Sequence, residues 1–250
     1  MKIKRIIIAI ATMLIVVMPA KSKVLVDDVV EVPFASYAKY SNGAFGVDLQ
    51  MPNGFTDGKH MGKYQPVLPN GGTGIVWTIG AMLQSGDRQC AVLMPDMFWR
   101  GYDLVEENVG DVSDFAQCET YWAVKGAVWY EYLQNHKAID MAKYEQRIDA
   151  YMFNADTAAL VTLPANDTIM GQHYTHRNFL VLKKANRPVV LVNVFFTDKG
   201  AKVSDKYLRN VFAAVKYSNE TGWQFNQDFA IKLRDKCLKE YFDYYGQFLR

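Results

Sequence analysis

The sequence predicts an α+β fold, in which a mostly antiparallel sheet is flanked by helices as an α/β/α sandwich. Segments with strand-like patterns fall into two groups, in residues 45–94 and 158–196, and the predicted hairpin links inside them are short. Short links favour hairpins, because parallel strands need longer crossovers. Helical apolar patterns lie between the two groups and after the second. Since half of the 250 residues are apolar, the chain can form a sizeable core.

The first twenty residues have the pattern of a secretory signal. Basic residues at positions 2, 4 and 5 precede an apolar run from Ile6 to Met18, and the small residue Ala20 closes the segment. We expect residues 1–20 to be a signal peptide that is cleaved after residue 20 or 22, so that the mature protein is periplasmic or secreted. The apolar run is shorter than the roughly 20 residues of a transmembrane helix, which predicts no permanent membrane span. An uncleaved signal anchor is the alternative, because Met18 stands where a small residue is preferred.

Removal of the signal leaves a nearly neutral chain. Three of the 28 basic residues lie in the signal, so 25 remain against 26 acidic residues, a net charge of −1. Nucleic-acid binding needs a clustered basic face, and attraction to an anionic membrane surface needs excess basic residues, so neither partner is predicted. The sequence has no internal repeats, and residues 21–250 are expected to form a single domain.

The first group of strands follows a lead-in, residues 21–40, for which no regular element is predicted. Apolar and polar residues alternate from Phe45 to Leu49, which predicts a strand, and turn residues follow at 52–54. Residues 75–83 and 89–94 are predicted as two further strands, joined by a hairpin loop at 85–88.

A pair of helices is predicted between the two groups of strands, as an insertion over residues 113–153. Apolar residues recur at helical spacing from Phe115 to Leu133, and Asp140 can cap a second helix. The connection between the helices, residues 135–139, is short, so we expect them to be antiparallel neighbours.

The second group of strands covers residues 158–163, 179–183 and 189–196, and a tight connection joins the last two. A helix capped by Ser204 follows, with apolar residues up to Val215. A long C-terminal helix is predicted from Phe225 to Phe248, because apolar and aromatic residues recur there about every four positions.

Residues 45–55 have the sequence FGVDLQMPNGF, and residues 189–198 have the sequence VVLVNVFFTD. These segments resemble the first strand and turn, and the late strand before a packing helix, of PsbP-like domains. The resemblance covers about half of the chain and implies an α/β/α sandwich around an antiparallel sheet. Because that family consists mostly of binding and assembly factors, the resemblance also implies a non-enzymatic role. The helical pair and the long final helix depart from the family pattern, and no functional residue is carried over, since the family shares no catalytic set.

An aromatic and acidic cluster after the second hairpin strand is the candidate ligand site. It comprises Asp96, Trp99, Arg100, Tyr102 and Asp103. Aromatic rings stack on sugars and peptides, while carboxylate and guanidinium groups bond to their polar edges. The alternative is an aromatic cluster that closes the core beside a surface ion pair.

His173 and His176 are weak candidates for a metal site. A spacing of three places two residues on one face of a helix but on opposite faces of a strand, and the polar neighbours of this pair suggest a loop. Metal sites need further ligands and the HExxH pattern is absent, so we expect a polar loop without metal, and no cofactor.

The three cysteines allow one disulfide in an oxidising compartment. Cys90 with Cys118 is the expected pair, whereas Cys237 lies in an apolar helical stripe that suggests burial. The sequence contains neither a CxxC nor a GxSxG motif, so the signatures of thiol oxidoreductases and serine hydrolases are missing.

The sequence therefore favours an exported, soluble, non-catalytic protein that binds a ligand or takes part in assembly. Its expected partner is a small molecule, a glycan or an envelope protein. The alternative is a hydrolase of an envelope or other polymer, using acids near Asp96 and Asp103 or the pair His173 and His176. A third hypothesis is a subunit of a larger assembly, with the helical pair or the final helix as its interface.

Overall fold

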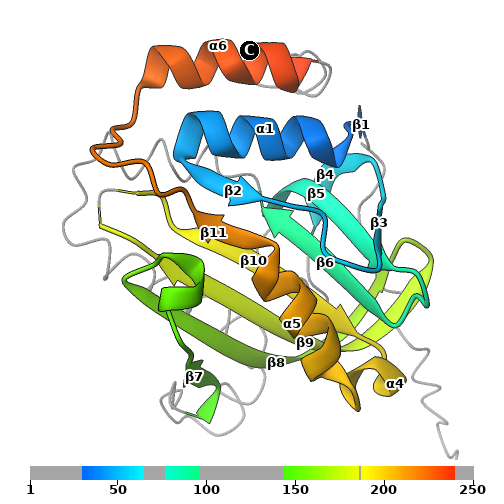
Figure 1. The fold of residues 1–250 in the computed structure, drawn as a ribbon. Coiled ribbons are helices and arrows are strands. Elements are labelled where there is room, and N and C mark those ends of the chain that lie inside the picture. Colours follow the sequence, from blue (N-terminus) through cyan, green and yellow to red (C-terminus); the bar gives the residue numbers. More distant parts are fainter. Residues whose placement is uncertain (1–29, 65–76, 96–142, 186, 240–250) are drawn as a thin grey trace, which may run out of the picture.

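The computed structural model describes residues 30–64, 77–95, 143–185 and 187–239, and all structural statements below refer to these residues. They form a large antiparallel sheet and a separate pair of strands (Figure 1). Strand order in the large sheet is β1-β4-β5-β6-β10-β9-β8-β7, and β3 pairs with β5. The strands of this sheet are β1 (Val30–Glu31), β3 (Phe55–Asp57), β4 (His60–Tyr64), β5 (Trp77–Ser85), β6 (Cys90–Pro95), β7 (Glu145–Arg147), β8 (Thr157–Ile169), β9 (Gln172–Lys183) and β10 (Val190–Phe196).

Helices and the small sheet complete the described fold. They are α1 (Phe34–Phe45), α4 (Asp198–Ala201), α5 (Ser204–Ala213), α6 (Gln227–Cys237), the 3-10 helix η2 (Tyr151–Phe153), and the pair β2 (Val47–Leu49) and β11 (Val215–Tyr217). In Figure 1, α1 and α5 lie over the large sheet, and α6 lies along the outer side of α1. The predicted α+β class with a large antiparallel sheet is confirmed. None of the described helices has both the length and the apolar content to cross a membrane.

The two predicted groups of strands join into one sheet through β6 and β10, which pair antiparallel. The predicted hairpin of β5 and β6 and the pairing of β9 with β10 are confirmed. A two-residue turn at Met170 and Gly171 joins β8 to β9, and both residues have a positive φ, of 50° and 72°. Positive φ at both central positions is the geometry of a type I′ hairpin turn, which matches the twist of the strands that it joins.

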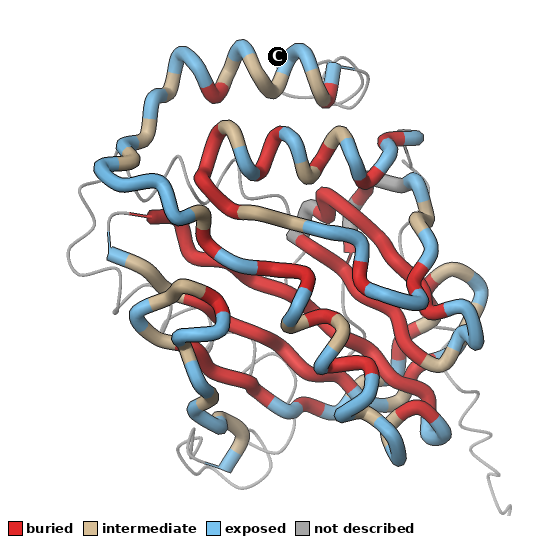
Figure 2. Tube along the Cα trace, viewed as in Figure 1, coloured by how far each residue is buried: buried red, intermediate tan, exposed pale blue. Residues whose placement is uncertain are grey.

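Side chains of the large sheet alternate between two buried faces. Val192, Val194 and Phe196 of β10 pack in one core cluster with residues of α1, α5 and α6, and we call this side the helix face. Leu191 and Phe195 of the same strand belong to a second cluster, on what we call the second face. All seven residues of β10 are buried, and Figure 2 shows the buried strands running through the molecule. The described helices contribute only to the first cluster, and the predicted helix at 113–133, which would supply another layer, lies outside the described residues.

Helix α1 occupies part of the segment for which no regular element is predicted, so that expectation is wrong for residues 34–40. Its buried residues, Phe34, Tyr37, Tyr40, Ser41, Ala44 and Phe45, follow helical spacing. Gly46 ends the helix in a left-handed conformation, with φ of 61°, and its N–H bonds to the carbonyl of Asn42. Phe45 therefore closes a helix, and the predicted strand starts two residues later, at Val47.

The predicted second helix of the inserted pair is also wrong where the structure describes it. Residues 145–147 form β7, which pairs with β8, and residues 151–153 form the short helix η2. A three-residue edge strand is too short to leave a period in the sequence, and its pairing with β8 decides its conformation. Strands β8 and β9 are longer than predicted, because their polar hairpin ends continue the backbone pairing as far as Ile169 and Gln172.

Arg187 holds together three segments that are far apart in sequence. Its Nη1 atom donates to the Gly46 carbonyl at 3.1 Å and to Ser218 Oγ at 3.2 Å, and its Nη2 atom donates to the Glu220 carbonyl at 3.0 Å. The guanidinium also lies over the Trp223 ring, 4.4 Å from its centroid. The end of α1 is thereby fixed to the segment that follows β11.

Candidate functional site

The predicted aromatic and acidic cluster cannot be placed. Asp96, Trp99, Arg100, Tyr102 and Asp103 follow β6 directly and lie outside the described residues. Their role as a ligand site stays a prediction.

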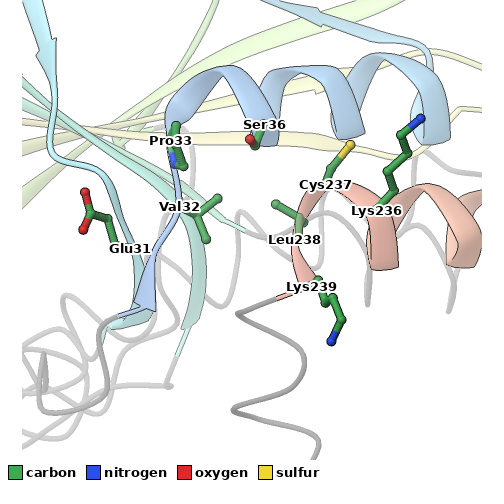
Figure 3. A pocket seen from close by; sticks show the side chains of 8 residues that line it. All are labelled: Glu31, Val32, Pro33, Ser36, Lys236, Cys237, Leu238 and Lys239. Atoms are coloured by element: carbon green, nitrogen blue, oxygen red, sulfur yellow. The ribbon is translucent and has the colours of Figure 1, made fainter.

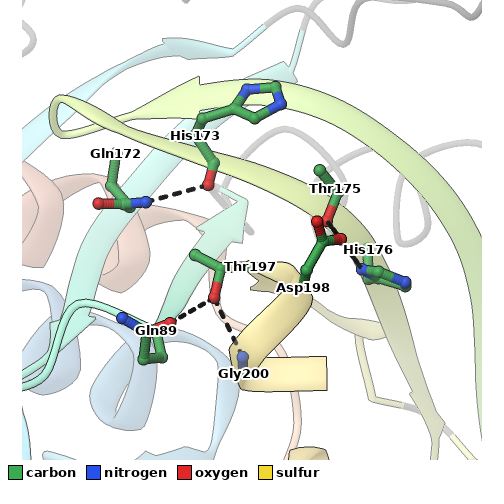
Figure 4. Close-up of polar contacts among 8 residues, drawn as sticks. All are labelled: Gln89, Gln172, His173, Thr175, His176, Thr197, Asp198 and Gly200. Carbon is green, nitrogen blue, oxygen red and sulfur yellow. Dashed lines mark hydrogen bonds and ion pairs between the residues drawn. The ribbon is translucent and has the colours of Figure 1, made fainter. Parts of the chain in front are cut away.

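The pair His173 and His176 lies on strand β9, so the expected polar loop is wrong. His176 pairs with Pro164, and His173 pairs with Thr168, which draws this polar segment into the β8–β9 hairpin. Figure 4 shows the two imidazole rings pointing away from each other. Within the described part of the chain, no group of three or more His, Cys, Asp or Glu side chains could hold a metal ion.

His176, Thr175 and Asp198 form a chain of polar contacts at the surface (Figure 4). Thr175 Oγ1 donates to Asp198 Oδ1 at 2.6 Å and lies 2.9 Å from His176 Nδ1. The single hydroxyl proton of Thr175 is donated to the Asp198 carboxylate. In its contact with His176, Thr175 Oγ1 therefore accepts from Nδ1–H. In a catalytic triad the imidazole stands between the acid and the hydroxyl, whereas here the hydroxyl stands between the other two, so the arrangement does not activate Thr175 as a nucleophile.

Thr197 makes a second polar contact, which joins the turn before β6 to the start of α4. Thr197 caps α4 by accepting from the Gly200 N–H at 3.0 Å, and its hydroxyl donates to Gln89 Oε1 at 2.5 Å (Figure 4). This contact ties the turn between β5 and β6 to the start of α4 and has a structural role.

Cys90 and Cys237 are free thiols in the structure. Cys90 is fully buried on the helix face of β6, and burial, followed by the charge of Asp87, raises the pKa of its thiol well above its ordinary value. The predicted partner, Cys118, lies outside the described residues, so the disulfide stays a prediction.

A cavity of about 190 Å³ lies where the segment leading into α1 meets the end of α6 (Figure 3). It is lined by Glu31, Val32, Pro33, Ser36, Lys236, Cys237, Leu238 and Lys239. Ligand pockets usually measure about 300–1,000 Å³ and are mostly apolar. This smaller cavity, with exposed Glu31 and Lys236 at its wall, is therefore not the favoured site.

A buried polar group on the second face of the sheet is the strongest candidate among the described residues. Arg177 of β9 and Asn193 of β10 are 3% and 0% exposed, which is rare for such polar side chains. Together with the neighbouring rings and acid they form what we call the Arg177 cluster: Tyr64, Asp167, Arg177, Phe179, Asn193 and Phe195. Strand register explains their meeting, since Phe195 stands opposite Arg177, and Asn193 stands opposite Phe179.

Arg177 and Asn193 satisfy each other only in part. Arg177 Nε donates to Asn193 Oδ1 at 2.8 Å. The Nη2 atom of Arg177 and the Nδ2 atom of Asn193 are buried and have no hydrogen-bond partner. A buried donor without an acceptor costs roughly 1–3 kcal/mol, and more when it is charged, so two such donors in adjacent side chains need an explanation.

Three aromatic rings surround the guanidinium of Arg177. Its Cζ atom lies 6.0 Å from the ring centroid of Tyr64, 5.6 Å from that of Phe179 and 5.7 Å from that of Phe195. Contacts of this kind favour a cation over the ring faces but give its N–H groups no acceptor. Among the described residues, no ion pair joins Arg177 to an acid.

Asp167 and Tyr64 complete the electrostatics of the cluster. Burial raises the pKa of the Tyr64 phenol well above its ordinary value, while Arg177 lowers it and Asp167 raises it further. Tyr64 is therefore neutral at physiological pH. Asp167 is 2% exposed, and its carboxylate acts on the Tyr64 phenol from within the core. Hydrogen-bond donors in an aromatic setting can hold an acceptor group of a ligand, which is a binding chemistry rather than a nucleophilic one.

Sequence reasoning missed this cluster. Asn193 interrupts the apolar run VVLVNVFF, and a polar residue inside a strand that is otherwise wholly apolar was the available signal. Arg177 precedes the apolar segment FLVL and gave no comparable signal, because it stands at the edge of a polar stretch. Its meeting with Asn193 depends on strand register, which the sequence alone does not specify.

Comparison of the chain with models of known protein families, with curated proteins and with solved structures finds no match. The resemblance to PsbP-like domains accordingly stays a prediction.

Proposed function

We propose that the protein is an exported, non-catalytic binding protein that holds a small molecule at the Arg177 cluster. The observation that carries this proposal is the pair of buried donors without acceptors, Arg177 Nη2 and Asn193 Nδ2. A ligand with a hydrogen-bond acceptor would satisfy both donors and would recover the free energy that their burial costs. Export follows from the signal-like segment at residues 1–20.

The surroundings of the two donors support binding over catalysis. Ligand sites combine mostly apolar surroundings with a few polar groups that fix orientation, and here the rings of Tyr64, Phe179 and Phe195 surround the guanidinium of Arg177. The raised pKa of Tyr64 keeps its phenol protonated, so Tyr64 does not act as a nucleophile near neutral pH.

A buried water molecule is the competing explanation for the two donors. Water can accept two hydrogen bonds, and buried waters commonly satisfy polar groups inside proteins. A water site and a ligand site differ in their response to added compounds, because only a ligand raises the stability of the protein, and it does so with the logarithm of its concentration above Kd.

A thermal-shift screen of the mature full chain tests the proposal. The panel contains small organic acids and amides, oligosaccharides, cell-wall fragments, peptides and divalent metals. A ligand at a hundred times its Kd stabilises by about 2.7 kcal/mol, which corresponds to roughly 5–10 °C in a domain of this size. We expect a hit whose effect disappears in Arg177→Met and persists in Arg209→Met, a matched control at an exposed arginine of α5.

Hits that stabilise Arg177→Met as strongly as the wild-type protein would contradict the proposed site. If Arg177→Met does not fold, native mass spectrometry of the exported wild-type protein gives an independent readout. The proposal expects a bound small molecule there, and a mass equal to that of the bare chain would contradict it.

A further inference from the structure

The second face of the large sheet is buried, although the described helices supply no residue to its core cluster. That cluster contains fourteen described residues, and each of them is at most 4% exposed. Helices α1, α5 and α6 contribute to the first cluster instead, on the helix face. A sheet face stays open to water unless a second layer packs on it. The burial of the second face therefore calls for a covering segment.

The connection from β6 to β7 joins two parallel strands. Strands β6, β10, β9, β8 and β7 pair antiparallel in that order, so β6 and β7 point the same way with three strands between them. Parallel strands are joined by a crossover rather than by a hairpin, and the crossover passes over one face of the sheet. Residues 96–142 form this connection, which spans about 19 Å from strand to strand.

The hand of the connection selects the face. In Figure 1 the helix face is towards the viewer, and when the view is turned so that β6 points upward, β7 lies to its left. A connection in front of the sheet would then be left-handed, whereas one behind the sheet would be right-handed. Crossovers between parallel strands are right-handed in about 98% of cases. The rule therefore takes residues 96–142 across the second face.

The two ends of the described segments agree with this path. Tyr144, which directly precedes β7, packs against the second cluster. Residues 65–76 link the antiparallel neighbours β4 and β5 and need not cross a face. Residues 240–250 follow α6, which lies along the outer side of α1 on the helix face (Figure 1). Residues 96–142 are thus the segment whose connections fit the second face.

The sequence of this connection matches an apolar surface. Its predicted helix carries one apolar stripe, formed by Phe115, Cys118, Trp122, Trp129 and Leu133. A helix over residues 115–133 would be about 28 Å long, which is enough to cross from β6 to β7. The stripe would then pack on the apolar side chains of the central strands.

We propose that residues 96–142 dock on the second face of the sheet, with the apolar stripe of the predicted helix against β8, β9 and β10. The stripe is then used within the chain and is not free to be the interface of a larger assembly. This placement does not depend on the proposed ligand. It also separates Cys118 from Cys90, because Cys90 lies on the helix face and a disulfide needs Cα atoms within about 7 Å. The docking and the predicted disulfide are therefore alternatives.

Disulfide formation with the native Cys118 tests the docking in the full chain. Cys90→Ala and Cys237→Ser remove the other thiols, and one cysteine is introduced at adjacent strand positions, whose side chains point to opposite faces. The second-face variants are Val161→Cys, Val181→Cys and Leu191→Cys, and their helix-face controls are Leu160→Cys, Leu182→Cys and Val192→Cys. After mild oxidation of the native protein, we expect Cys118 to be cross-linked in most molecules of at least one second-face variant and in no control.

Three results would overturn the inference: a link from Cys118 in a helix-face control, links only between two copies of the chain, or no link in any second-face variant. Circular dichroism shows which variants fold. The wild-type protein gives a readout that needs no variant, because the docking predicts three reactive thiols after unfolding without a reductant. A native disulfide between Cys90 and Cys118 would contradict the docking.

Discussion

Arg177 Nε donates a 2.8 Å hydrogen bond to Asn193 Oδ1 between neighbouring strands of the sheet, and the Nη2 and Nδ2 groups beside that bond have no acceptor. The pair thus satisfies itself only in part, inside a core of aromatic rings. Partly satisfied polar groups in a core are less stable than an apolar replacement of the same shape. Their presence is consistent with a role in binding rather than in folding.

Replacement of the pair by apolar residues should therefore leave the free protein nearly as stable. We expect the free energy of unfolding of the double variant Arg177→Met with Asn193→Leu to lie within about 1 kcal/mol of the wild-type value. Asn193→Leu alone should cost about 2–4 kcal/mol, because it leaves the charged Nε of Arg177 without an acceptor as well. Urea unfolding of both single variants and the double variant measures these differences. If the free energy of unfolding falls in the double variant by the sum of the two single decreases, the pair stabilises the fold, which would contradict a role in binding alone.

Gly46 should tolerate no side chain. Its φ is +61°, and a Cβ atom at this position would overlap the Arg187 guanidinium, which bonds to the Gly46 carbonyl. We expect Gly46→Ala to destabilise the protein by about 2 kcal/mol or more, because it adds the loss of the Arg187 contacts to the cost of a left-handed alanine. Thermal or urea unfolding measures the change.

Gly54 provides the matched control for Gly46. Its φ is +79°, and nothing lies within 4 Å of an added Cβ atom. Gly54→Ala should show only the backbone cost of roughly 1–2 kcal/mol. Equal losses in the two variants would mean that Arg187 contributes nothing at this position.

Asp87 should make the stability of the protein depend on acid pH. Partial burial would raise the pKa of its carboxyl, but hydrogen bonds from Tyr207 Oη at 2.7 Å, Ser85 Oγ at 2.7 Å and the Gln89 N–H lower it below the ordinary value. A lowered folded pKa stabilises the protein fully above the unfolded pKa, near 4, and this stabilisation is lost as pH falls through the folded pKa.

Tyr207→Phe tests the contribution of Asp87. The variant should lose about 1 kcal/mol at pH 6, and the difference from the wild-type protein should shrink towards pH 3 as Asp87 becomes protonated. Tyr151→Phe is the control, since Tyr151 is 90% exposed. Urea unfolding across this pH range measures the difference in free energy between the variant and the wild-type protein. A difference that stays constant with pH would contradict the role of Asp87.

Cys90 should be protected from thiol reagents in the native protein. Its side chain is fully buried with a raised pKa, whereas Cys237 is half-buried. In a Cys118→Ser chain, we expect Cys237 to react with a disulfide reagent under native conditions and Cys90 only after unfolding. Rapid native reaction of both thiols would show that the helix face is not closed over β6. In the unmodified chain, thiols are counted after unfolding without a reductant. One reactive thiol would support the predicted disulfide between Cys90 and Cys118, and three would contradict it.

Strands could be predicted from the sequence where apolar residues alternate regularly or form a continuous run. The alternation from Val47, the hairpin of β5 and β6, and the apolar run of β10 all form strands, although the strand at Val47 belongs to the small sheet with β11. Helix α1 was not predicted, because Lys39, Asn42 and other polar residues on its exposed side dilute the helical spacing of its aromatic residues. The hairpin end of β8 and β9 was missed for a similar reason, since backbone pairing there carries polar side chains such as His173.

The candidate site depended on information that a single strand does not contain. Asn193 could be recognised as a polar residue in an apolar run, but its partner could not be identified. Arg177 becomes its neighbour only through the register that places Phe195 opposite Arg177. A shift of one residue would turn either side chain to the other face of the sheet.

The most direct test of the central claim is a high-resolution crystal structure of the native protein, purified without refolding. We predict density for a small molecule other than water, with acceptor atoms at hydrogen-bond distance from both Arg177 Nη2 and Asn193 Nδ2. A single water at that position, or protein acceptors on both nitrogens, would contradict the assignment of the Arg177 cluster as a binding site.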